Sequence, residues 1–117
     1  MSYDKSISWW QNECYKLACD KGFHDDGINN SMPTLVANLV GECAELWEEY
    51  RKPEFDAKRT YYREKDGKPE GGPPELADIF IRTMDAAGAL GIDLEKAVIE
   101  KHEFNKSRPF RHGGKRA

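Results

Sequence analysis

Residues 34–50, TLVANLVGECAELWEEY, decide the fold, because their apolar side chains recur at the spacing of an α-helix. Those side chains are Leu35, Val36, Leu39, Val40, Cys43, Leu46, Trp47 and Tyr50, and this spacing gathers them on one side of the helix. The predicted helix begins near Thr34. It ends before Pro53, because proline disfavours the helical conformation of the residue that precedes it.

Acidic side chains accompany this apolar face. Glu42 and Glu45 are three residues apart, which places both carboxylates on one side of the helix, and Glu49 follows on the same stripe. The stripe borders the apolar face and does not oppose it. We therefore expect these acids at the rim of the core, which is an unusual position for glutamates that only solvate a surface.

A first helix is predicted over residues 6–21. Ser8-Trp9-Trp10-Gln11 has the form of a capping box, and Gly22 stands where a helix commonly ends. Residues 22–33 are rich in Gly, Asn and Asp, which indicates a loop, and this loop carries His24.

Two more helices follow the long polar segment after Pro53. One starts at Pro73-Pro74 and ends at Gly91, and the other is capped by Asp93 and runs to about Asn105. The apolar residues of the former that share one face are Leu76, Ile79, Phe80, Thr83, Ala87 and Leu90. We find no persuasive strand, so residues 1–117 are predicted to form one all-α domain, an antiparallel bundle of about four helices.

Two segments lie outside this predicted bundle. Residues 53–72 are rich in proline, glycine and charge, and they are predicted to form a long exposed loop of the kind that often serves as a lid. Residues 106–117 are a basic tail without acidic residues, which either meets an anionic partner or is simply solvated.

Composition limits the class of protein. A hydrophobic content of 38% is enough for one core, and no stretch approaches the roughly 20 apolar residues of a membrane span. The three cysteines show no paired spacing, which favours a reducing, cytoplasmic compartment. The net charge of −3 hides an uneven distribution, because the C-terminal end is basic. We expect neither a membrane nor a nucleic acid as partner.

A second acid pair, Glu75 and Asp78, repeats the three-residue spacing on the next helix. If the two pairs face each other, about four negative charges share a small volume, which is costly unless some protonate or a cation intervenes. Oxygen ligands of this kind suit Mg²⁺ or Mn²⁺. The alternative is that both pairs are ordinary surface acids of amphipathic helices.

The last helix adds Lys101 and Asn105, which continue the stripe of Leu94 and Val98 that we expect to face the bundle. A cation and an amide opposite a carboxylate cluster would suit a phosphate that bridges metal and protein. The alternative is a fraying helix end on which Lys101 extends to solvent.

These motifs together resemble the MazG-like all-α nucleoside triphosphate pyrophosphohydrolases. The resemblance rests on Gly41-Glu42-Cys43-Ala44-Glu45-Leu46, on Glu75-Leu76-Ala77-Asp78-Ile79, and on the ending from Gly91 to Lys115. It implies that Glu42, Glu45, Glu75 and Asp78 are the catalytic metal ligands. It also implies that Lys101, Asn105 and Arg108 contact phosphate or sugar, with His112 and Lys115 as phosphate contacts from the tail.

Phe23-His24 is similar to part of the dCTP pyrophosphatase branch of the family, in which His24 would border the base. The chain departs from that branch in the long spacing between its acid pairs and in Arg82, where the branch tends to have an aromatic residue. The preferred base is therefore left open.

The family resemblance implies an Mg²⁺-dependent enzyme that cleaves a nucleoside triphosphate to the monophosphate and pyrophosphate. Such an enzyme would clear unwanted nucleotides and would work as a homodimer or homotetramer whose subunits share the site. Two alternatives stay open, namely a related enzyme acting on phosphoribosyl-ATP and a non-catalytic helical module that binds nucleotide or protein.

Overall fold

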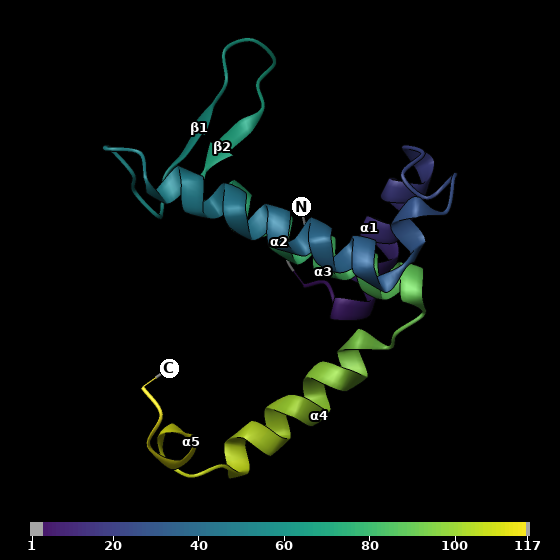
Figure 1. Cartoon of the computed structure of the whole chain (residues 1–117), viewed down its shortest axis with the longest axis vertical. Coiled ribbons are helices and arrows are strands. Elements are labelled where there is room, and N and C mark those ends of the chain that lie inside the picture. Colours follow the sequence, from purple (N-terminus) through teal and green to yellow (C-terminus); the bar gives the residue numbers. More distant parts are fainter. Residues whose placement is uncertain (1–3, 117) are drawn as a thin grey trace.

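The computed structural model describes residues 4–116, except the side chain of His112. Its four long helices are α1 (Ile7–Asp20), α2 (Met32–Tyr50), α3 (Gly72–Leu90) and α4 (Leu94–Ser107) (Figure 1). The smaller elements are η1 (Ile28–Asn30), β1 (Thr60–Tyr62), β2 (Pro69–Gly71) and α5 (Arg111–Gly114). The predicted all-α fold is confirmed, since the one sheet in this range has two three-residue strands.

Local sequence signals account for most helix ends. Asp93 caps α4 by accepting a hydrogen bond from the Lys96 amide, and Gly91 ends α3 with a φ of 66°, which glycine adopts readily. The capping-box prediction at Ser8 is wrong, because Ser6 is the cap of α1 and its hydroxyl accepts from the Trp9 amide at 3.0 Å.

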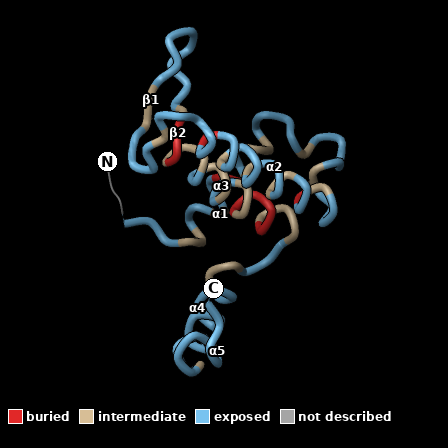
Figure 2. Tube along the Cα trace, turned by 60° about the vertical axis from the view of Figure 1, so that its left-hand side comes forward, coloured by how far each residue is buried: buried red, intermediate tan, exposed pale blue. Residues whose placement is uncertain are grey.

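Helix α3 is the centre of the fold, since it packs against both α1 and α2. The approach of α1 is close at Gly88, where an added Cβ would lie 2.5 Å from the Cβ of Tyr15. The buried apolar residues are few, namely Cys14, Leu35, Met84, Ala86 and Ala87. Figure 2 shows how little of the described chain is fully buried.

Only some residues of the apolar face predicted for α3 are buried. Ala87 is buried, but Leu76 is 60% exposed and Phe80 is also exposed. The neighbouring Met84 and Asp85 are buried instead. Periodicity identifies an apolar face, whereas the packing of α1 and α2 decides which part of that face they cover.

The apolar side chains of α2, which were predicted to form a single face, form one inward stripe and one exposed stripe. Leu35 is buried, and Leu39 and Leu46 are partly buried with it. Val36, Val40, Cys43, Trp47 and Tyr50 are exposed at alternating spacings of four and three residues. That spacing is the one of a coiled-coil seam. We call these five residues the α2 seam.

Residues 53–72 differ from the predicted loop because they include a β-hairpin. Strand β1 pairs antiparallel with β2, with Tyr61 opposite Glu70. The Tyr61 hydroxyl donates to Glu49 at 2.8 Å and so ties the hairpin to the end of α2. At the hairpin base, Gly71 has a φ of 115°, and an added Cβ would lie 2.5 Å from the Arg59 carbonyl oxygen.

Helix α4 does not face the bundle as predicted. It extends away from the body formed by α1, α2 and α3 (Figure 1), and none of its residues is buried. Of the stripe expected to face inward, Leu94 is partly buried and Val98 is exposed, and the main contact of α4 is with α1. In residues 4–116, no helix has the length and apolar character needed to cross a membrane.

The exposed surface is large for the size of the chain. A folded monomer of 13.4 kDa should expose about 6,500 Å², whereas this chain exposes 9078 Å². The radius of gyration is 16.7 Å, compared with about 13 Å for a compact domain of this length. A single chain therefore leaves much apolar surface uncovered.

Candidate metal centre

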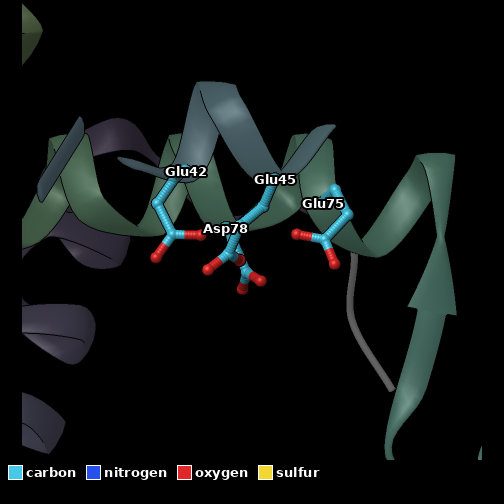
Figure 3. A group of neighbouring side chains, drawn as sticks. All are labelled: Glu42, Glu45, Glu75 and Asp78. Carbon is cyan, nitrogen blue, oxygen red and sulfur yellow. The ribbon is translucent and has the colours of Figure 1, made fainter. Parts of the chain in front are cut away.

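The antiparallel packing of α2 on α3 brings the two acid pairs together. One carboxylate oxygen from each of Glu42, Glu45, Glu75 and Asp78 lies within 4.8 Å of the others. Figure 3 shows the four side chains reaching the same side of the two helices. The three-residue spacing on each helix gives each pair a common direction, and the helix packing makes the two directions converge.

The four carboxylates differ in their surroundings. Glu45 is exposed, whereas the other three are partly buried. Glu42 accepts a hydrogen bond from the Arg82 guanidinium at 3.0 Å. In the described part of the chain, the Glu75 Oε2 atom is buried without any hydrogen-bond partner, an arrangement that costs free energy when nothing else binds there.

Burial and like charges act together on these groups. Burial raises the pKa of Glu75 above its usual value, and the other three acids of the cluster raise it further. Burial, followed by the Glu42 charge, raises the pKa of Asp78. The positive charge of Lys68 opposes both shifts, and that of Arg82 opposes the shift at Asp78.

The donor set fits a hard divalent cation. All four groups offer oxygen, and no nitrogen or sulfur ligand belongs to the cluster among the described residues. The orphaned Glu75 oxygen is the kind of atom that a cation would satisfy. At such separations each carboxylate pair repels by about 3–4 kcal/mol at an effective dielectric constant near 20, so a bound cation would remove a large cost.

Two cationic residues near the cluster were not predicted as site residues. Arg82 stands one turn after Asp78, and that spacing was the available signal. Lys68 lies in the polar segment before α3, and nothing local in the sequence indicates that it meets the acids. The hairpin brings it there, beside a cavity of about 370 Å³ that Glu45 and Glu75 also line.

The predicted phosphate contacts are not beside the acids of the same chain. Lys101 and Asn105 are exposed on α4, which leaves the body of the protein (Figure 1), and Arg108 is partly buried just after it. The Lys101 and Arg108 cations lie 5.5 and 5.8 Å from the Phe104 ring centre.

The remaining predicted contacts lie in the tail and in the loop before α2. Lys115 is exposed, and the side chain of His112 lies outside the described residues. His24 is held inside the protein, because its Nε2 lies 2.7 Å from Asp85 and its Nδ1 lies 2.6 Å from Asn30. Its ring also contacts Tyr15 of α1.

Comparison of the chain with family models and with curated proteins finds no match in either.

We expect Glu75→Gln and Asp78→Asn to raise the melting temperature of the metal-free protein, because each change removes one of four repelling charges. The same variants should bind Mn²⁺ about tenfold more weakly or worse, because each loses an anionic ligand. Thermal unfolding in chelator and calorimetry with Mn²⁺ measure the two effects. Glu13→Gln, an exposed acid on α1, is the control. Unchanged Mn²⁺ binding in both variants would remove the site.

We expect the His24–Asp85 pair to stabilise the fold most at low pH. Burial alone lowers the pKa of His24, but the hydrogen bonds to Asp85 and Asn30 and the Asp85 charge outweigh it, so the pKa is raised above 6.5. The contribution is therefore complete below the unfolded-state pKa and is lost as pH rises through the folded value. His24→Gln should lower the melting temperature more at about pH 5.5 than at about pH 8.5. An equal loss at both values would contradict this.

Proposed function

We propose that the protein is a divalent-metal-dependent nucleoside triphosphate pyrophosphohydrolase. The observation that supports this most is the convergence of four carboxylates from two helices within 4.8 Å, with one buried oxygen unsatisfied. The motif resemblance supports the same activity. A helix surface that only interacts with a partner protein has no need of such a costly arrangement.

The described residues divide the work. Glu42, Glu75 and Asp78, which are partly buried, hold Mg²⁺ or Mn²⁺ together with Glu45. The cation, when bound, supplies charge neutralisation of the phosphates and activation of a water molecule. The exposed Glu45 carboxylate would take up a proton from an attacking water and exchange it with solvent. Arg82 holds the Glu42 carboxylate in place.

The reaction follows from attack of water on the α phosphorus. The bond from that phosphorus to the oxygen bridging α and β breaks, and the products are a nucleoside monophosphate and pyrophosphate. The leaving pyrophosphate keeps the electron pair of the broken bond. The chain contributes positioning and charge, and forms no covalent intermediate.

We expect one pyrophosphate per monophosphate from a panel of ribo- and deoxyribonucleoside triphosphates and phosphoribosyl-ATP. In water enriched in oxygen-18, the label should appear in the monophosphate, because the α phosphorus is attacked. Asp78→Asn should lower kcat by about a hundredfold, and chelator should abolish turnover. Orthophosphate as the sole product, free of contaminating pyrophosphatase, would contradict the proposal.

We further propose that a second copy of the chain covers the α2 seam. The exposed area of one chain exceeds that of a compact monomer by about 2,500 Å², so two chains have an excess of about 5,000 Å², at the upper end of the range that an obligate dimer buries. The seam offers Val40 at 62% and Trp47 at 58% exposure, too large and apolar to be typical of a monomer surface. A symmetric pair of seams would bury both.

Assembly would also give α4 a place in the site. Lys101 and Asn105 are exposed on a helix that extends away from the body of its own chain, and Arg108 follows that helix. We propose that all three serve the acids of the second copy. The resemblance, in which subunits share the site, points the same way.

Mixing two inactive variants tests this sharing. Lys101→Met and Asp78→Asn should each be nearly inactive alone. Mixed in equal amounts and allowed to exchange subunits, they should recover about a quarter of wild-type activity, because half of the dimers carry one intact site. Val40→Asp should yield monomers and no recovery, whereas Ala37→Asp, on the same helix outside the seam, should still recover. Mixtures that stay inactive despite exchange would place α4 outside the partner's site.

A further inference from the structure

A cavity adjoins the acid cluster on the side of the hairpin. It has a volume of about 370 Å³, large enough for a diphosphate. Glu45 and Glu75 line it from the metal-ligand side, and Lys68 and Glu70 line it from the hairpin. The end of α2 lines it with Glu48, Glu49 and Lys52, and the cavity is open to solvent. A ligand held by a cation at the cluster would therefore extend along the hairpin.

The ammonium groups of Lys52 and Lys68, which both line this cavity, differ in the hydrogen bonds and ion pairs that they form. Lys52 donates to Glu49 at 2.9 Å and to the Tyr61 hydroxyl at 2.8 Å, so its donors are largely used. Within residues 4–116, the Lys68 ammonium forms no ion pair, although Lys68 stands next to an acidic cluster. Its positive charge acts on Glu75 and Asp78.

The hairpin that carries Lys68 is joined to the end of α2. Glu49 is only 8% exposed and joins α2 to β1 through the Tyr61 hydroxyl. At the turn, Arg63 pairs with Asp66, and Asp66 accepts a hydrogen bond from the Lys68 amide at 3.2 Å. The Tyr61 hydroxyl thus joins the hairpin to α2, and the bonds of Asp66 shape the turn from which Lys68 leads into β2.

We propose that Lys68 binds the β and γ phosphates of the substrate, so that the hairpin serves as the pyrophosphate-binding element of the site. This inference rests on the proposed function. A free ammonium at the mouth of the cavity has no stable partner among the acids once a cation occupies them, whereas the terminal phosphates supply one. Lys68 then assists departure of pyrophosphate and favours triphosphates over diphosphates.

The opposing role for Lys68 is that of a counter-ion for the empty acid cluster. The two roles predict different changes in Mn²⁺ affinity when Lys68 is replaced. A counter-ion competes with the cation, so its removal tightens Mn²⁺ binding and leaves phosphate ligands unaffected. A phosphate-binding residue affects the phosphate ligand instead.

Calorimetric titration of pyrophosphate into the Mn²⁺-loaded protein distinguishes the roles without turnover. Lys68→Met should weaken pyrophosphate binding by about 10- to 100-fold, while Lys68→Arg should retain most of it. Lys65→Met, which removes a charge from the same turn away from the cavity, is the matched control and should bind as wild type. Circular dichroism checks that each variant is folded.

Activity gives the second readout. Lys68→Met should raise KM or lower kcat for a triphosphate by a similar factor, with the effect smaller for the matching diphosphate. Unchanged pyrophosphate affinity in a folded Lys68→Met protein would overturn the inference, with or without tighter Mn²⁺ binding. If the wild type releases no pyrophosphate from any nucleotide, the proposed function fails, and that outcome is separate from the Lys68 result.

Discussion

Repulsion among four carboxylates is the constraint on which the rest of the structure depends, because α2 and α3 must pack closely enough to hold Glu42, Glu45, Glu75 and Asp78 together. Each pair costs about 3–4 kcal/mol at this range, comparable with the roughly 1.5–3 kcal/mol from burying one large apolar side chain. The apolar contacts that offset this cost are few. The packing of α2 on α3 therefore holds the cluster together against this repulsion.

Two cations reduce the repulsion from different directions. Arg82 comes from α3 itself and is hydrogen-bonded to Glu42. Lys68 comes from the hairpin, and its charge acts on both acids of α3. The first is committed to a ligand carboxylate, whereas the second is free to meet an anion. Arg82 is therefore suited to positioning the Glu42 carboxylate, and Lys68 is suited to binding an anionic ligand.

The core of the described chain is thin, and α4 extends away from it. Four helices with large apolar side chains would normally bury most of them, yet Val40, Trp47 and Leu76 are exposed. The chain therefore has more apolar surface than one copy can cover. A proposed second copy would cover the α2 seam and give α4 something to face. The same assembly would bring further cations from α4 to the acidic site, in addition to Arg82 and Lys68.

Local sequence determined the helical class, several helix ends and the direction of each acid pair. Pro53, Gly91 and Asp93 act through their own backbone or side chain, and a three-residue spacing aligns two carboxylates whatever the helix packs against. The metal-ligand and phosphate-contact roles are still predictions. The helical fold and the convergence of the four acids are features that the structure shows.

Tertiary structure alone decided the rest, because it depends on which distant segments meet. The α2 pattern does not distinguish Leu35, which is buried, from Val36, which is exposed, since each lies on an apolar stripe and only the position of α3 separates them. His24 gave no local sign that it would pair with Asp85. Likewise, Lys68 lies beside the acid cluster through the hairpin, which Tyr61 on one strand joins to Glu49 on α2. That contact joins residues 12 apart and cannot be read from the periodicity of either segment.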